Sequence, residues 1–169
     1  MISKRYYLIL GLIPGLLFAT PKQQQLTHAW ELPSLILPDL QGIQHNLFDW
    51  QGKIIILNFW ATWCGPCQIE IPHLKRYQDK YAAKGLQVIG VGLDEKRKLR
   101  NFVRTLAIHY PVLHADPKLD YSMLAKWGNV SGTLPYTVVI DRQGQFVLMH
   151  QGIFSDQAFT QYVLPLLVD

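Results

Sequence analysis

Apolar residues along the chain fall into runs with two different spacings, and these spacings predict alternating strands and helices. The runs 54–60 and 86–93 are apolar almost throughout, which is typical of strands buried on both faces of a parallel sheet. Between them, apolar residues from Ile69 to Tyr81 fall roughly on one face of a helix. Two parallel strands joined by a helix form a right-handed βαβ unit. The pattern therefore predicts an α/β fold.

The segments on either side of this unit predict further elements. Residues 32–47 resemble a small β-hairpin around the turn-forming segment 38–42, and 48–53 form a second turn before the central strand. Residues 138–141 and 146–150 predict two more strands around the hairpin turn 142–145, the last strand being antiparallel to its neighbour. Ser155 is a candidate cap for a final helix, which Pro165 should kink or fray.

Residues 95–107 predict an amphipathic helix with an unusually basic outer face. Apolar side chains occupy one face of this helix. The other face carries basic side chains, namely Lys96, Arg97, Lys98, Arg100 and Arg104. A charged helix face of this kind usually faces solvent, and a docking surface for an acidic partner or anionic lipid is the alternative. The formal charge of the whole chain is only +4, which argues against a nucleic-acid partner.

The first residues have the character of a targeting segment. Residues 1–21 combine a short basic start with an uncharged apolar run over 6–19. This run is shorter than the ~20 residues that span a bilayer and suits the apolar core of a signal peptide. A cleaved signal peptide and an uncleaved membrane anchor both stay open. Residues 22–31 predict a linker and 32–169 a single domain, exported to a compartment where disulfides persist.

Both cysteines of the chain lie in the segment Trp63-Cys64-Gly65-Pro66-Cys67, where the central strand passes into the helix. The start of a helix presents free N–H groups and a partial positive charge, which stabilise a thiolate, the reactive form of cysteine. Cys64 is therefore the predicted nucleophile and the more exposed sulfur. Cys67, one turn into the helix, is the predicted resolving cysteine. Pro66 suits the first helical turn, and Gly65 lets a partner approach the backbone.

A C-x-x-C pair alone also fits half of a zinc site or a buried structural disulfide. A structural zinc site needs four ligands, and the sequence contains no second C-x-x-C pair. His73 could add a ligand from the same helix, but no convincing fourth ligand follows. The position between a buried strand and a helix favours redox chemistry.

The segment 59–67 resembles the active site of the thioredoxin superfamily. Asn58 within the strand, Glu70 three residues after Cys67, and Pro72 resemble its TlpA/ResA-like branch of bacterial thiol-disulfide oxidoreductases. The resemblance implies a thioredoxin-like α/β fold with a central mixed β-sheet flanked by helices. It also implies an N-terminal β-hairpin extension and an inserted strand and helix, which 110–114 and 119–127 could supply.

The same resemblance implies roles for residues outside the cysteine pair. Pro135 matches the superfamily's cis-proline, in a loop that faces the cysteines, although an ordinary proline at a strand entry is the alternative. The backbone of Leu134 would then pair with an extended substrate, and Trp63, Gly65 and Pro66 would contact the substrate as well.

A second pair of residues concerns proton transfer. Asn58 stands where plain thioredoxins carry a buried, ionisable aspartate that serves the resolving cysteine. In the TlpA/ResA-like branch a glutamate at the position of Glu70 has a comparable role. A simple surface charge on the helix is the alternative for Glu70.

These expectations combine into an exported thiol-disulfide oxidoreductase that reduces protein disulfides, with cytochrome c maturation as a pathway suggested by the family. It would need no cofactor and no metal, and a membrane electron donor would restore its dithiol. Two alternatives stay open. A thiol peroxidase needs a threonine three residues before its cysteine, whereas Thr62 precedes Cys64 by two. A copper(I) chaperone suits thiolate chemistry but usually has a wider cysteine spacing.

Overall fold

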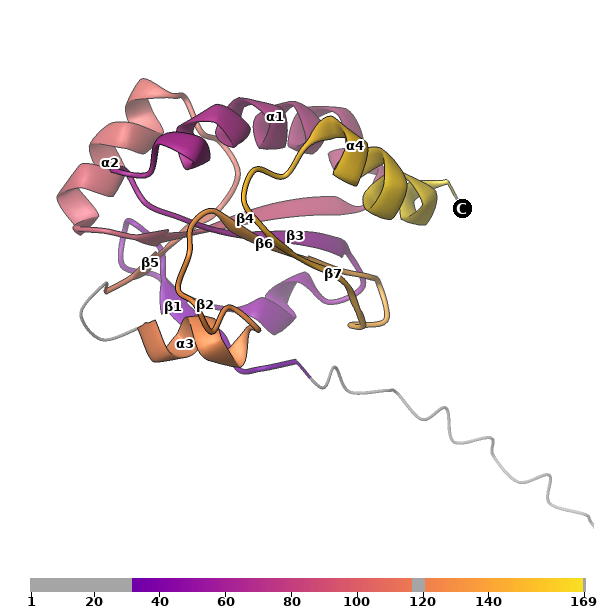
Figure 1. Ribbon diagram of the computed structural model, residues 1–169, viewed down its shortest axis with the longest axis horizontal. Coiled ribbons are helices and arrows are strands. Elements are labelled where there is room, and N and C mark those ends of the chain that lie inside the picture. The colour runs from indigo at the N-terminus through magenta and orange to yellow at the C-terminus, as the bar shows by residue number, and fades with distance from the viewer. Residues whose placement is uncertain (1–31, 117–120, 169) are drawn as a thin grey trace, which may run out of the picture.

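The computed structural model describes residues 32–116 and 121–168 of the chain (Figure 1). The predicted targeting segment 1–21 and linker 22–31 lie outside the described residues, as do residues 117–120.

A five-stranded sheet with the order β5-β4-β3-β6-β7 forms the centre of the domain. Strands β3, β4 and β5 are parallel, whereas β6 is antiparallel to β3 and β7 is antiparallel to β6. The bounds are β3 Ile54–Trp60, β4 Leu86–Leu93, β5 Val112–Ala115, β6 Tyr136–Ile140 and β7 Phe146–Gln151. This is the mixed sheet that the family resemblance implied, and it confirms the predicted fold class.

Helices and the hairpin cover the two faces of this sheet (Figure 1). One face carries α1 (Gly65–Tyr81), α2 (Lys96–Thr105) and α4 (Asp156–Ala158), and the other carries α3 (Tyr121–Lys126) with β1 and β2. Successive residues of a strand point to opposite faces. Along β3, Ile56 and Trp60 therefore join the core under α1, while Leu57 and Phe59 join the core on the other side with Trp127. Two cores explain why β3 and β4 are apolar throughout.

The predicted N-terminal hairpin is present as β1 (Ile36–Pro38) and β2 (Gln44–Asn46). Its turn is fixed by Asp39, whose Oδ1 accepts the backbone N–H groups of Gln41, Gly42 and Ile43 at 2.7–2.9 Å. An isolated bridge from Asp39 to Leu113 attaches the hairpin to β5. The predicted second turn is instead a short 3-10 helix over Leu47–Trp50 followed by a turn.

Two helices differ in detail from the sequence pattern. Ile69, which the periodicity placed on the inner face of α1, is 59% exposed, and the inner face consists of Cys67, Glu70, Ile71, Leu74 and Tyr77. Tertiary contacts thus place a carboxyl group where the apolar spacing suggested isoleucine. In the final helix Ser155 caps α4 as predicted, and the helix then changes to a π turn and a 3-10 turn at Leu164–Leu167, around Pro165.

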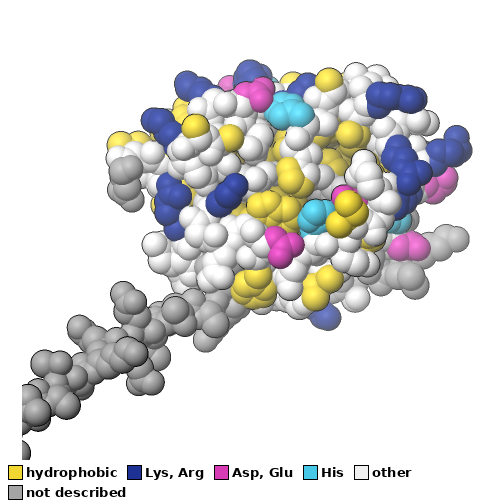
Figure 2. All heavy atoms as spheres, turned by 180° about the vertical axis from the view of Figure 1, so that it is seen from behind, with side chains coloured by type: hydrophobic (Ala, Val, Ile, Leu, Met, Phe, Trp, Pro, Cys, Tyr) yellow, Lys and Arg dark blue, Asp and Glu magenta, His cyan; other side chains and the backbone are white. Residues whose placement is uncertain are grey.

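Helix α2 has the predicted amphipathic character. Leu99 is fully buried, whereas Arg97, Lys98 and Arg104 are exposed. Figure 2 shows Lys and Arg side chains at the edge where α2 lies and apolar side chains toward the middle of the same face. Arg100 donates hydrogen bonds to the carbonyl of Leu40, so part of this charge holds the helix against the hairpin. The exposed positions agree with the solvated face that the sequence favoured, and a docking role for this face stays the untested alternative.

Candidate active site

The two cysteines form a disulfide at the start of α1. The Cys64–Cys67 bond has an S–S distance of 2.04 Å, and the two Cα atoms are 5.3 Å apart. Cys64 is the N-cap of the helix, where its Sγ accepts the backbone N–H of Cys67 at 3.3 Å. Pro66 occupies the first turn, where a missing N–H costs no helical hydrogen bond. The sulfur of Cys64 therefore lies within the positive end of the helix dipole.

The two cysteines are buried, whereas the residues next to Cys64 in the sequence are exposed. Cys64 is 4% exposed and Cys67 is completely buried, so the difference has the predicted direction but is small in the oxidised form. Trp63 is 65% exposed, and Gly65 and Pro66 are exposed as well. A partner can therefore contact the three residues that flank Cys64 before it reaches the sulfur.

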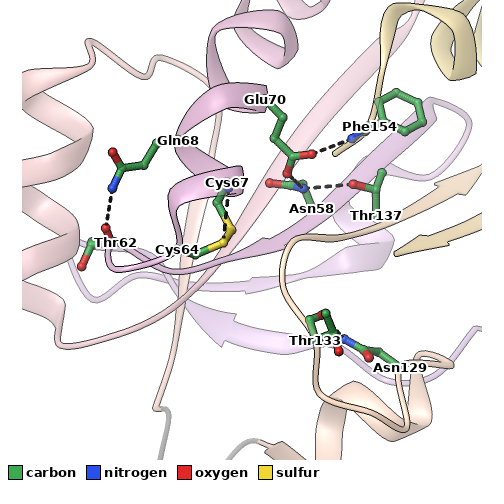
Figure 3. The surroundings of a disulfide bond; sticks show 10 residues. All are labelled: Asn58, Thr62, Cys64, Cys67, Gln68, Glu70, Asn129, Thr133, Thr137 and Phe154. Atoms are coloured by element: carbon green, nitrogen blue, oxygen red, sulfur yellow. Dashed lines mark hydrogen bonds between the residues drawn. A yellow bond between two sulfur atoms is a disulfide. The ribbon is translucent and has the colours of Figure 1, made fainter. Parts of the chain in front are cut away.

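Behind the disulfide, the carboxyl group of Glu70 is buried in a polar pocket formed by three elements (Figure 3). Its Oε1 accepts a hydrogen bond from Nδ2 of Asn58 on β3 at 2.6 Å, and its Oε2 accepts the backbone N–H of Phe154 at 2.8 Å. Asn58 Nδ2 also donates to Oγ1 of Thr137 on β6 at 3.0 Å. Helix α1, the sheet and the segment before α4 thus meet at one carboxyl group.

Burial has a strong effect on the acidity of this carboxyl group. Removal from water raises the pKa of Glu70 to about 7, and the hydrogen bonds from Phe154 and Asn58 oppose this rise without cancelling it. Glu70 is therefore not the exposed helix charge that the sequence left as an alternative. It is a buried group that can gain or lose a proton near neutral pH.

The loop before β6 passes close to the same core. The peptide bond between Leu134 and Pro135 is cis, as predicted. Pro135 is buried, and Leu134 is half-buried and packs against the core cluster that contains Cys64 and Cys67. No hydrogen bond joins the backbone N–H or C=O of Leu134 to another residue of the described ranges.

The turn between β3 and Cys64 is held by polar contacts. Nε2 of Gln68 donates to the carbonyl of Thr62 at 2.9 Å, and the hydroxyl of Thr62 donates to the carboxylate of Asp94 at the end of β4. The Thr62 hydroxyl is thus directed to Asp94 instead of Cys64. This contact gives no support to the thiol peroxidase alternative.

Comparisons with known proteins agree with this geometry. A model of the AhpC/TSA family matches residues 29–149, which is more than half of the chain. The chain belongs to the AhpC/TSA family. Within the thioredoxin superfamily it is a ResA-like thiol-disulfide oxidoreductase.

Relatives in both sequence and structure are named for thiol-disulfide chemistry. The thiol-disulfide oxidoreductase ResA of Geobacillus kaustophilus is 34% identical over 132 residues, covering 78% of this chain and 73% of the relative. A thiol:disulfide interchange protein of the thioredoxin family from Chlorobium tepidum is 30% identical with a TM-score of 0.68, covering 80% of this chain and 94% of that one. A secreted thiol-disulfide isomerase from Corynebacterium glutamicum is 27% identical with a TM-score of 0.73, covering 82% and 86%.

Several contacts in this ResA-like oxidoreductase were not anticipated from its sequence. Thr137 lies directly opposite Asn58 in the antiparallel pairing of β6 with β3, so correct strand register would have revealed it. The Phe154 contact uses a backbone N–H, for which the sequence carries no signal. Asp156 was also missed; its Oδ1 lies 3.1 Å from Nδ1 of His73, which the sequence analysis considered only as a possible zinc ligand.

Within residues 32–116 and 121–168, no three side chains of His, Cys, Asp or Glu are grouped so that they could hold a metal ion. In the same residues, no helix is both long enough and apolar enough to cross a membrane.

Proposed function

We propose that this oxidoreductase reduces disulfide bonds in exported polypeptides by dithiol–disulfide exchange at Cys64 and Cys67. The single observation that carries the proposal is the disulfide at the first turn of α1, where Cys64 caps the helix and Cys67 is buried behind it. This arrangement favours the thiolate form of the outer cysteine. The Gly-Pro dipeptide between the cysteines, shared with the reducing thioredoxins, supports the direction of reduction.

In the first step, the reduced protein attacks its substrate. The Cys64 thiolate bonds to one sulfur of the substrate disulfide, and the substrate S–S bond breaks. The other substrate sulfur leaves as a thiolate and takes a proton from solvent. The product is a mixed disulfide between Cys64 and the substrate.

In the second step, Cys67 resolves this intermediate. Its thiol loses a proton, bonds to Cys64 Sγ and displaces the second substrate sulfur as a thiolate, so that two electrons have passed to the substrate. We assign the proton acceptor to Glu70, which follows Cys67 by three residues on the same face of α1. A carboxyl group with a pKa of about 7 is suited to general-base catalysis near neutral pH.

The substrate would bind beside the exposed residues Trp63, Gly65 and Pro66. Across from them, the unpaired backbone groups of Leu134 offer a short edge to which an extended polypeptide can add as a strand. Pro135 fixes the course of the chain after this edge. Backbone pairing of this kind accepts many sequences, which suits an enzyme that acts on polypeptide disulfides.

The setting of the reaction forms part of the proposal. The apolar run at residues 6–19 supports export, with the domain either released or tethered to the membrane. A membrane electron donor would return two electrons to the Cys64–Cys67 disulfide after each cycle, and the chain itself would need no cofactor. We place the activity in cytochrome c maturation, following the family resemblance of the active-site segment.

Trapping and alkylation test the assignment of the two cysteines. With a disulfide-bearing peptide, reduced Cys67→Ser protein should accumulate a mixed disulfide at Cys64, which mass spectrometry of the intact protein detects. In the reduced wild-type protein, iodoacetamide should alkylate Cys64 much faster than Cys67 near neutral pH. The reason is that only Cys64 lies at the N-terminus of the helix, next to exposed residues.

Cys64→Ser is the matched control and should trap little of the peptide. Equal trapping by both variants, or faster alkylation of Cys67, would contradict the assignment. Rapid turnover of peroxide by the wild type would favour the peroxidase alternative, and stable binding of copper(I) would favour the chaperone. In the host, Cys67→Ser should capture the substrate itself for identification.

A further inference from the structure

The loop that leads to the cis peptide bond is organised around one buried amide side chain, that of Asn129. This residue follows α3 and is 1% exposed. Its Nδ2 donates to the carbonyl oxygen of Thr133 at 2.8 Å (Figure 3). Its Oδ1 accepts from Oγ of Ser131 at 3.1 Å and from Nε2 of Gln151 at 3.3 Å. A buried amide is costly unless it is hydrogen-bonded, and here both ends of the amide are used.

The bond to Thr133 fixes the plane of one peptide group. The Thr133–Leu134 peptide is trans, since the only cis bond in the described ranges follows Leu134. In a planar trans peptide the C=O and N–H groups point to opposite sides. Because Asn129 holds the carbonyl of Thr133, the N–H of Leu134 must point away from Asn129. That N–H is one of the two backbone groups of Leu134 that have no partner in the described structure.

The same network ties the loop to the far side of the proline. Gln151 is the last residue of β7 and lies opposite Tyr136, the first residue after Pro135. Its Nε2 donates to Ser131 Oγ at 2.5 Å as well as to Asn129. Hydrogen bonds therefore hold the loop to Asn129, which follows α3, and to Gln151, the last residue of β7. The unpaired backbone groups of Leu134 lie between these two points of attachment along the chain.

We propose that Asn129 is a positioning residue for polypeptide substrates: by holding the Thr133 carbonyl, it aims the N–H of Leu134 at the substrate strand. The inference rests on the proposed function, because it concerns how the same site recognises its substrate. It separates two classes of disulfide. A polypeptide disulfide has backbone groups that pair with Leu134, whereas a small disulfide has none and needs only access to Cys64.

The test compares two disulfides with two variants. Asn129→Asp keeps the shape of the side chain but removes the Nδ2 donor and places an oxygen against the Thr133 carbonyl. We expect the rate constant for reduction of a disulfide-bearing peptide to fall roughly tenfold, the effect of about one hydrogen bond to the substrate. The rate constant for hydroxyethyl disulfide should stay within about twofold of wild type. Asn101→Asp, an exposed position on α2, is the control for the added charge.

A second variant and a spectroscopic measurement protect the test against misfolding. Gln151→Leu changes an exposed side chain, so this variant should fold. It should lower the rate constant for the peptide by less than Asn129→Asp does, and it should leave the rate constant for hydroxyethyl disulfide unchanged. The ¹⁵N–¹H chemical shift of Leu134 should change in Asn129→Asp. The inference would be overturned if Asn129→Asp lowered the rate constants for both disulfides equally or lowered neither. An unchanged Leu134 amide signal in this variant would also overturn it. Wild type that cannot reduce the peptide at all would instead refute the proposed function.

Discussion

Two carboxyl groups lie where α1 meets the segment 154–156, and their surroundings are opposite. Glu70 projects from α1 into the core and is completely buried. It accepts hydrogen bonds from two neutral donors, the amide of Asn58 and the backbone N–H of Phe154. Its pKa rises to about 7, with removal from water as the largest cause. The two hydrogen bonds are too weak to offset burial.

Asp156 lies two residues after Phe154, and its side chain is 63% exposed. Its Oδ1 accepts from the hydroxyl of Tyr77 and lies 3.1 Å from Nδ1 of His73 and 3.4 Å from Nη2 of Arg76. The hydrogen bond from Tyr77 is the largest cause of a lowered pKa for Asp156. Burial thus brings the pKa of Glu70 to near neutral pH, whereas hydrogen bonding at the surface lowers that of Asp156, so of these two carboxyl groups only Glu70 can exchange a proton at neutral pH.

The largest effect should come from removing the buried carboxyl group. Glu70→Gln keeps the size of the side chain but cannot accept the proton of Cys67. Release of the substrate from a mixed disulfide at Cys64 should slow by about 10²-fold, the lower end of the range for general-base catalysis. In wild type this rate should rise with pH through about 7, as Glu70 ionises, and rapid-quench measurement across the range should show the rise.

Glu95→Gln is the matched control, because Glu95 is an exposed glutamate on the surface before α2. It should leave the resolving step unchanged. Alkylation of Cys64 should also change little in Glu70→Gln, since the first step does not use the carboxyl group. If Glu70→Gln released the substrate at the wild-type rate at every pH from about 6 to 8, Glu70 would have only a structural role.

The second effect concerns stability, and its sign follows from the direction of the pKa shift. The pKa of Glu70 is 4.5 in the unfolded reference and about 7 in the folded protein. The folded form thus holds its proton more tightly, which stabilises it below pH 4.5, and this stability is lost as the pH rises through 7. The loss amounts to about 3 kcal/mol.

Glu70→Gln has no such titration, so the comparison isolates the effect. Relative to wild type, the free energy of unfolding of the variant should increase by about 3 kcal/mol between about pH 4 and pH 8, so that the variant becomes the more stable of the two. Guanidinium denaturation of the oxidised proteins gives this difference and keeps the cysteines from titrating. A constant difference across this range would show that Glu70 does not have a raised pKa.

The sequence predicts the framework of this site better than its interior. The strand predicted at 86–93 is β4 itself, because continuous burial leaves a continuous apolar run. The helix predicted at 95–107 is α2 at Lys96–Thr105, because one face alone is buried. The strand-to-helix placement of Cys64 and Cys67 follows from the same patterns. Strands and helices that are buried in a regular pattern can be predicted from the spacing of their apolar residues.

Contacts made by backbone groups or by single buried polar residues are not readable in this way. The N–H of Phe154 and the amide of Asn129 hold the two halves of the site, yet neither belongs to a periodic pattern. Ile69 shows the converse, since its spacing fits the inner face of α1 although the residue is exposed. Asn58 was recognised as non-ionisable, but only the fold shows that its amide donates to Glu70.

The smallest effect should come from Asp156→Asn, which removes the exposed charge and keeps the shape. A lowered pKa means that the charged form stabilises the fold above the ordinary pKa of aspartate, and that this stability is lost as the pH falls through the folded pKa. Wild type should therefore be slightly more stable than Asp156→Asn at neutral pH and lose that advantage in acid. The advantage should shrink in high salt, because exposed ion pairs are screened.

The same variant tests whether the two carboxyl groups act independently. The ring of Phe154 is completely buried in the core under α1, so its N–H should stay on Glu70 without help from Asp156. The rise in the rate of the resolving step should then keep its midpoint near pH 7 in Asp156→Asn. A shifted midpoint would mean that the ion pairs of Asp156 help to place the Phe154 N–H, and that the surface of the 154–156 segment tunes the buried acid.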